Sequence, residues 1–401
     1  MLRPFLLLLV VSTVLCKSFV IQPGIWNYNN HPIAYEQAQL LDTTAIDKKA
    51  ADASAAASDT NNDPPAPILL LNGFGVGSFH QHRLISSIMN EKELGSHTIY
   101  TIDYLGQGKS WPKDCNDGKA ASEQGLQYSG STWVDQIIQF IDNVIVPGHN
   151  HKKLHIVGNS VGGHLAVFIA AARPDLIESI CLLNATPVWG LNLPGWTGHL
   201  PAPAIPRWIG RYLFDRIRDL DTIEAYLENA YSNTDAFDKE LMQQILSCTD
   251  GQGGHAAFAS ILWSPPIQVK TLQGETVKNF DACLSRLECD VLLLFGSGDP
   301  WCKPAFARRM LKSLATRPAS AVHRYVELSN IGHCPNHEAP TAVAHVLQSW
   351  IGAVDRRPEQ LALLSTETET IRESWGETTA RERRESEIQL STMDRIATTF
   401  V

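Results

Sequence analysis

The sequence has no internal repeat, no cysteine or histidine spacing typical of zinc sites and no glycine loop of the phosphate-binding kind. It is also poor in basic residues, because 33 Lys and Arg stand against 42 Asp and Glu, for a net charge of −9. Domains that bind nucleic acid carry a basic patch, so this balance argues against such a partner. We expect no metal and no cofactor. With 44% hydrophobic residues, the 401-residue chain can bury a full-sized core.

None of the eight cysteines lies in a Cys-x-x-Cys arrangement. A chain of this length needs no disulfides to supplement its core, so we expect buried or free thiols. Cys302 and Cys334 lie close in sequence to candidate catalytic residues discussed below. A regulatory disulfide between these two is the alternative.

The N-terminus carries an apolar run at residues 5–15, which is too short to cross a bilayer. It follows Arg3 and precedes Cys16-Lys17-Ser18, which predicts a secretory signal peptide at residues 1–18. No second apolar segment of about 20 residues follows, so the mature protein is expected to be soluble or peripheral to a membrane. Removal of residues 1–18 would leave Phe19 as the new N-terminus. A Phe at this position resembles the two-part leaders of algae with secondary plastids, which implies import into a plastid. The alternative is secretion, or residence in the endomembrane lumen.

Short apolar runs alternate with helical patterns from residue 67 onward. Runs of this kind, bounded by turn residues, are typical of buried parallel strands. The runs are ILLL (68–71), TIYTID (98–103), LHIVG (154–158), ICLLN (180–184), VLLLFG (291–296) and HRYVEL (323–328). The alternation predicts an α/β fold, with a mostly parallel, doubly wound sheet covered by helices on both faces.

Three segments interrupt or end this pattern. Residues 42–66 are polar and rich in Ala and Asp, which predicts a flexible insertion. Residues 187–266 are rich in Trp, Tyr and Pro and have little strand pattern, so we expect a mainly helical cap. Residues 357–401 are charged and are expected to form a disordered, solvated tail. The core domain then comprises residues 19–41, 67–186 and 267–356.

The run at 154–158 leads into Gly158-Asn159-Ser160-Val161-Gly162, which matches the Gly-x-Ser-x-Gly nucleophile elbow. Small residues beside Ser160 permit a tight turn that lifts its hydroxyl above the sheet edge. A small-residue helix pattern starts at once, so the serine stands at a helix N-terminus, where an oxyanion is stabilised. Ser160 is therefore the candidate nucleophile.

A serine hydroxyl needs a general base, and the base needs an orienting acid. On this fold the expected chain order is Ser, then Asp or Glu, then His. Asp299 and His333 follow the last two predicted strands, at the end of the sheet where open α/β folds keep their sites. We predict them as acid and base. The competing residues are His80, His255 and His337 for the base, and Asp103 and Asp290 for the acid.

Stabilising the oxyanion requires two backbone N–H groups. Val161, directly after the nucleophile, should supply one. The other should come from Asn72-Gly73-Phe74-Gly75, the loop after the first buried strand, and we select Phe74. Glycines on both sides let the backbone of this loop approach a substrate closely.

Together these features resemble an α/β-hydrolase with a cap domain. Five stretches narrow the resemblance to the pheophytinase group, plastid serine esterases that remove phytol from pheophytin. The stretches are IDYLGQGKS (102–110), LLNATPVWG (182–190), HAAFASILWSPP (255–266), GSGDPWCKP (296–304) and GHCPNHEAP (332–340). Where most of these relatives have His-Gly-Phe-Gly, this chain has Asn72 in place of the histidine, and Val161 stands where Leu is common.

The resemblance implies hydrolysis of a lipophilic phytyl ester, of pheophytin or chlorophyll, through an acyl-enzyme on Ser160. A cap rich in aromatic residues suits a flat macrocycle and a long isoprenoid tail, since apolar area must supply the binding. The residues expected to contact substrate are Phe74, Asn159, Trp189, Phe258, Trp263 and Trp301. Two alternatives remain, which are a general lipid or acyl ester hydrolase of the same fold and a non-catalytic protein that binds hydrophobic ligands. A peripheral association with the thylakoid or another membrane would fit such a substrate.

Overall fold

The structure is a computed structural model of the chain. It describes residues 18–41, 64–111, 128–150, 152–198, 203–249, 261–317, 321–356, 368–374 and 377–382. The predicted signal peptide (all but Ser18) and nearly all of the predicted insertion at 42–66 lie outside these ranges, as do parts of the cap and of the tail. No helix among the described residues has both the length and the apolar character needed to span a bilayer.

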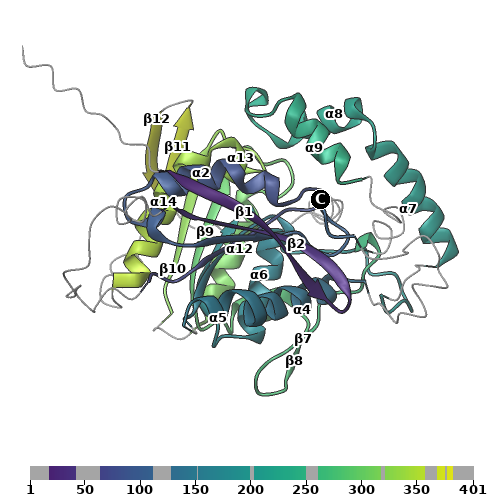
Figure 1. Cartoon of the computed structure of the whole chain (residues 1–401), viewed down its shortest axis with the longest axis horizontal. Helices are drawn as coiled ribbons and strands as arrows, with labels where there is room; N and C mark the ends of the chain where they lie inside the picture. The colour runs from purple at the N-terminus through teal and green to yellow at the C-terminus, as the bar shows by residue number, and fades with distance from the viewer. Residues whose placement is uncertain are drawn as a thin grey trace, which may run out of the picture.

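A ten-stranded sheet forms the centre of the molecule, in the order β1-β2-β4-β3-β5-β6-β9-β10-β11-β12 (Figure 1). Strands β4, β3, β5, β6, β9, β10 and β11 run parallel, whereas β1, β2 and β12 join antiparallel. The strands are β1 (Phe19–Tyr28), β2 (His31–Leu40), β3 (Ile68–Leu71), β4 (Ile99–Ile102), β5 (Leu154–Asn159), β6 (Ile177–Leu183), β9 (Asp290–Gly296), β10 (His323–Ser329), β11 (Thr368–Ser374) and β12 (Glu377–Glu382). The predicted α/β fold with a mostly parallel sheet is confirmed.

Each face of the sheet has its own hydrophobic core, because side chains alternate along a strand. In β3, Leu69 and Leu71 belong to one core, and Ile68 and Leu70 belong to the other. Strands that are apolar on both faces are therefore fully buried, which explains the continuous runs in the sequence.

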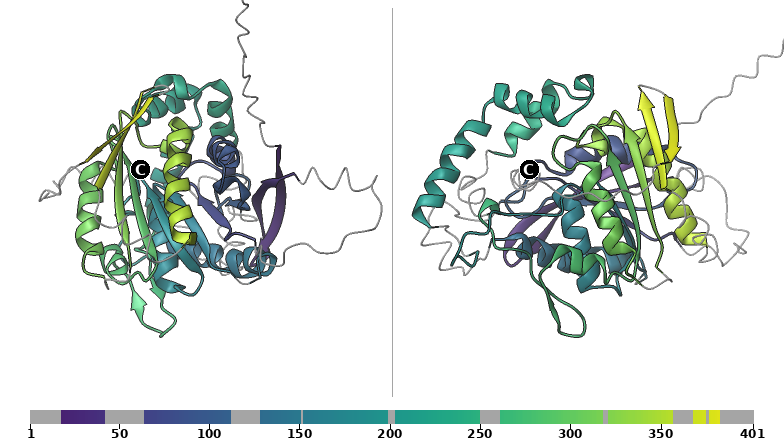
Figure 2. Two further views of the ribbon diagram at one scale, coloured as in Figure 1. Left: turned by 90° about the vertical axis from the view of Figure 1, so that its left-hand side faces the viewer. Right: turned by 180° about the vertical axis from the view of Figure 1, so that it is seen from behind.

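Helices cover both faces of the sheet (Figure 2). The core that contains Leu69 is shared with α4 (Gly130–Phe140), α6 (Val161–Ala172), α11 (Phe280–Leu284) and α12 (Pro304–Leu314). The other core is shared with α2 (His82–Asn90) and α14 (Pro340–Arg356). Short elements complete the core domain, namely η1 (Ser78–Gln81), η2 (Leu94–Ser96), η3 (Ile141–Ile145), α5 (Val146–Gly148), β7 (Val269–Lys270), β8 (Thr276–Val277) and α13 (Pro335–Glu338).

The segment between β6 and β9 contains the helical cap, which Figure 1 shows as a group beside the sheet. Its described elements are α7 (Ala204–Ile217), α8 (Leu220–Ala230), η4 (Thr234–Ala236) and α9 (Lys239–Ser247). Asp219 and Asp238 cap α8 and α9 by accepting hydrogen bonds from backbone N–H groups of the first turns. A small core between α8 and α9 extends to Trp301 and Phe79 of the main domain, which fixes this part of the cap over the sheet edge.

The tail differs from expectation. Residues 357–401 were expected to be disordered and solvated, yet β11 and β12 form within them, and β11 pairs in parallel with β10. The physical reason is that an edge strand offers unpaired N–H and C=O groups, which a polar segment can satisfy through its backbone alone.

Candidate active site

Ser160 lies between β5 and α6, in the turn that the sequence predicts. Its backbone has φ 54° and ψ −117°, a conformation that is strained for a residue with a side chain. The turn holds because Ser160 N–H donates to Leu183 O at 2.9 Å, and its carbonyl accepts from the N–H groups of Gly163 and His164. The serine therefore stands at the N-terminus of α6, as a nucleophile elbow requires.

Gly158 and Gly162 leave room for the close approach of backbone segments around Ser160. A Cβ on Gly158 would lie 2.5 Å from the backbone of Gly162, and one on Gly162 would lie 2.6 Å from Leu71 O. Both distances are far shorter than van der Waals contact allows. Helix α6 can start this close to β3 and β5 only because these positions lack side chains.

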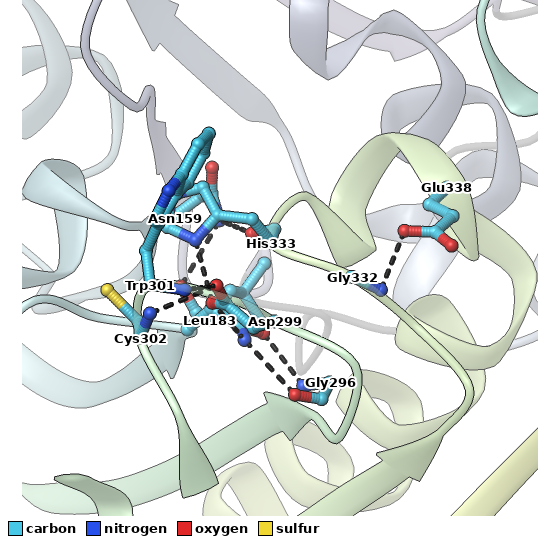
Figure 3. Close-up of polar contacts among 10 residues, drawn as sticks. Asn159, Leu183, Gly296, Asp299, Trp301, Cys302, Gly332, His333 and Glu338 are labelled. Atoms are coloured by element: carbon cyan, nitrogen blue, oxygen red, sulfur yellow. Dashed lines mark hydrogen bonds and ion pairs between the residues drawn. The ribbon is translucent and has the colours of Figure 1, made fainter. Parts of the chain in front are cut away.

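Asp299 and His333 meet in the loops after β9 and β10, as predicted from the sequence (Figure 3). The His333 Nδ1–H group donates to Asp299 Oδ2 at 2.7 Å, and both side chains are buried. The other carboxylate oxygen, Oδ1, accepts from the backbone N–H groups of Trp301 at 2.8 Å and Cys302 at 3.0 Å. These bonds fix the carboxylate and orient the imidazole so that Nε2 is left to act as a base.

Asn184, which the sequence analysis did not select, completes the environment of Asp299. Its Nδ2 donates to Asp299 Oδ2 at 2.7 Å, and its Oδ1 accepts from Gly296 N at 2.8 Å. Asn184 follows β6 with a positive φ of 42°, a conformation that Asn tolerates better than most residues. An Asn directly after a buried strand was the available signal, but its partner lies 115 residues away.

The serine and histidine loops are joined through Asn159. Its Nδ2 donates to His333 O at 2.9 Å and to Leu183 O at 3.2 Å (Figure 3). We expected Asn159 to contact substrate, and the structure gives its amide this link between the two loops. Ser160 Oγ is buried and has no hydrogen-bond partner within the described parts of the chain, so the structure shows no hydrogen bond from this hydroxyl to His333 Nε2.

The loop 72–75 lies against the serine. A Cβ on Gly73 would come within 3.6 Å of Ser160 Cβ, so this backbone borders the space where a reacting carbonyl would sit. The Gly75 N–H group already donates to Gln107 Oε1 at 2.7 Å, which removes it from the candidate oxyanion donors. Asn72, at the departure from the pheophytinase pattern, donates to Ile102 O at 3.3 Å. Phe74 and Val161 remain predictions from the sequence as the oxyanion donors.

The competing residues are engaged elsewhere. His80 and His337 stack on each other with ring centroids 4.9 Å apart, and burial lowers the pKa of His80 to about 3 and that of His337 to about 2. Asp103 accepts hydrogen bonds from Ser78 and from Lys109 N. Asp290 accepts from Val322 N. His255 lies outside the described residues.

The predicted substrate-contacting aromatics divide into three groups. Phe74 and Trp189 pack with ring centroids 5.1 Å apart, next to the candidate oxyanion loop, and Trp301 packs edge-on against His333 at 5.0 Å. Trp263 lies farther into the cap, where its Nε1 donates to Pro206 O at 3.3 Å. Phe258 lies outside the described residues.

The cap is tied to the histidine loop at one corner. His333 N–H donates to Ala230 O, at the end of α8, at 2.7 Å. The buried Glu338 carboxylate accepts from Gly332 N and from Asn233 N of the cap, each at 2.8 Å. The Gly332–Glu338 bond is drawn in Figure 3. Glu338, also missed from the sequence, thus connects the loop that carries His333 with the cap.

Asp299, Cys302 and His333 form a group whose potential ligand atoms lie within 4.8 Å of one another. The carboxylate oxygens and Nδ1 are already hydrogen-bonded, so the arrangement is satisfied as an acid–base pair. Cys302 and Cys334 are free thiols. Burial raises the pKa of both thiols, which keeps them protonated.

Comparison with known proteins identifies the family. Residues 68–346 match the alpha/beta hydrolase family. The chain belongs to this family.

Individual relatives agree with this fold. The chain is 29% identical to the chloroplastic pheophytinase of Arabidopsis thaliana over 351 residues, covering 79% of this chain and 66% of that protein. Among solved structures, a bacterial membrane phospholipase A matches at TM-score 0.55 and 18% identity, covering 84% of this chain and 87% of its own. A serine hydrolase involved in carbazole degradation (the CarC enzyme) matches at TM-score 0.54 and 14% identity, covering 83% and 99%.

Proposed function

We propose that the protein is a serine esterase that hydrolyses the phytyl ester of pheophytin, or of chlorophyll, to the pigment acid and phytol. The observation that carries the proposal is the hydrogen-bonded Asp299–His333 pair at the same sheet edge as the strained Ser160 elbow. Similarity to pheophytinase along most of this chain supports the substrate class. Because the alignment covers 66% of that protein, its substrate is carried over here as a proposal.

In the proposed mechanism, His333 Nε2 takes the Ser160 proton while Asp299 holds the ring in the correct tautomer. Ser160 Oγ attacks the ester carbonyl, and the backbone N–H groups of Val161 and Phe74 bind the oxyanion. His333 then protonates the leaving phytol, and a water molecule releases the acid from the acyl-enzyme. Loss of one oxyanion donor would raise the barrier by roughly 3 kcal/mol.

Phe74, Trp189 and Trp301 are the proposed contacts for the macrocycle, since Phe74 packs against Trp189 and Trp301 packs against His333. The apolar leader and the similarity to a chloroplast protein support a location in a plastid. A lipophilic ester of this kind would be met at a membrane surface, such as the thylakoid.

The deciding experiment is pigment turnover by purified protein, with pheophytin, chlorophyll and p-nitrophenyl esters assayed side by side and the products separated by chromatography. Release of phytol from pheophytin, absent in Ser160→Ala, is the expected result. Turnover of simple acyl esters with none of pheophytin would favour the general lipid esterase. Failure of a fluorophosphonate probe to label Ser160 would indicate a non-catalytic binding protein.

A further inference from the structure

Exposed apolar side chains are concentrated on one part of the cap. Among the described residues, six of the ten large hydrophobic side chains that are exposed fall between residues 205 and 226. Four of them lie on α7, and the three most exposed of these are Ile205, Trp208 and Tyr212, at 74%, 70% and 53%. Single exposed hydrophobic residues need no explanation, but a cluster of this kind marks an interaction surface.

The three side chains form one stripe along α7. They are spaced i, i+3 and i+7, which places them on the same side of a helix. The rings of Trp208 and Tyr212 stack with centroids 6.5 Å apart, and Arg216 continues the stripe by donating to the Tyr212 hydroxyl at 2.7 Å. The opposite side of the helix is already occupied, since Phe214 is buried. Helix α7 thus buries an apolar side chain, Phe214, on one side and exposes the apolar stripe on the opposite side.

The chemistry of this stripe favours a lipid bilayer as its partner. Trp and Tyr prefer the membrane–water interface, where the ring is in an apolar layer and the polar atom meets headgroups. Residues 204–217 contain Arg207, Arg211 and Arg216 against Asp215, so the helix carries a charge of +2 in a chain of −9. A locally basic helix with an aromatic face is complementary to an anionic membrane surface.

We infer that the Ile205–Trp208–Tyr212 stripe of α7 docks the protein on the surface of an anionic bilayer, with the rings in the interface and Arg211 and Arg216 at the headgroups. The helix is the first element of the cap, and α8, which follows it, contacts His333 through Ala230. Docking here would bring the cap to the layer in which a lipophilic ester resides. Only this last point depends on the proposed function.

The test compares the full-length protein with Trp208→Ser/Tyr212→Ser, using vesicles of phosphatidylglycerol mixed with phosphatidylcholine. Tyr226→Ser is the matched control, because Tyr226 is an exposed aromatic on α8 outside the stripe. Hydrogen exchange of residues 204–217 reports on docking at α7 even when the apolar leader also binds lipid. We expect vesicle-dependent protection of α7 in the wild type and in Tyr226→Ser, and its loss in the double variant.

Unchanged protection in the double variant, or no protection of α7 in the wild type, would overturn the proposal. Dimers that dissociate in the double variant, detected by light scattering without lipid, would show that the stripe binds a second copy. An equal fall in kcat/KM for a soluble ester and a vesicle-borne ester would place the stripe in the substrate site. Vesicle docking without pigment turnover would support this inference while refuting the proposed function.

Discussion

At the residue scale, Asp299 is the most heavily bonded group of the candidate site, with donors on both oxygens. An Asn in its place has only one acceptor oxygen, and its NH2 group, if it faced Nδ1, would hold the imidazole in the wrong tautomer. We expect Asp299→Asn to lower kcat for a chromogenic ester by about 10⁴-fold. Thermal unfolding of the variant would show whether the fold survives, and full activity would remove Asp299 from the mechanism.

Asn184 should act through Asp299. Its removal deletes one hydrogen bond to a charged group, worth about 1.5–3 kcal/mol, and leaves Gly296 N without its acceptor. Asn184→Ala is therefore expected to lower kcat by about 10- to 100-fold at a similar KM. Asn184→Gly is the matched control, because it relieves the positive φ while still lacking the amide. A wild-type kcat in both variants would contradict a positioning role.

At the scale of the element, the start of α6 depends on close backbone contact. A methyl group at Gly162 would meet two carbonyl oxygens, Leu71 O at 2.6 Å and Asn72 O at 2.7 Å. We expect Gly162→Ala to lower the free energy of unfolding by about 1–3 kcal/mol and to reduce activity, because the elbow must shift. Gly148→Ala in α5 is the control, since its methyl would meet only Tyr100 OH at 3.9 Å. Urea denaturation of the two variants provides the comparison.

Helix α6 also carries a buried titratable group, His164. Burial lowers its pKa to about 4, although its Nδ1–H donates to Thr186 O at 2.9 Å. Between an unfolded value of about 6.5 and the folded value, only the unfolded chain binds the proton, so stability falls as pH falls through this window, by up to about 1.4 kcal/mol per pH unit. We expect His164→Asn to flatten this slope in urea denaturation at a series of pH values. An unchanged slope would assign it to other groups, such as His80 and His337.

How far the sequence predicts the structure depends on the range of the interaction. Buried strands leave continuous apolar runs, and loops at strand ends keep their chain order, so the sheet and the positions of Ser160, Asp299 and His333 were predictable. Asn184 and Glu338 act on partners 115 and 105 residues away, and no local pattern marks such pairs. Strand β11 escaped prediction because residues 368–374 are mostly polar in sequence, and backbone pairing with β10 needs no apolar pattern.

At the scale of the whole molecule, the tail and the candidate site are separable. The site is built by loops after β3, β5, β6, β9 and β10, whereas β11 lies between the outer edge of β10 and β12 in the sheet order. We expect a chain ending at Arg356 to keep the proposed esterase activity. A chain ending at Ala339 should fail to fold, because it lacks the buried Val343, Leu347 and Trp350 of α14. If the chain ending at Arg356 lost activity while its circular dichroism spectrum stayed intact, the tail would have a functional role.

The corner at which Ala230 O accepts the His333 N–H bond has a mechanical consequence. With Glu338 bridging Gly332 and Asn233, the end of α8 is clamped to the loop that carries the imidazole. A displacement of this end of α8 would therefore also displace the loop that carries His333, because the same hydrogen bonds join the two.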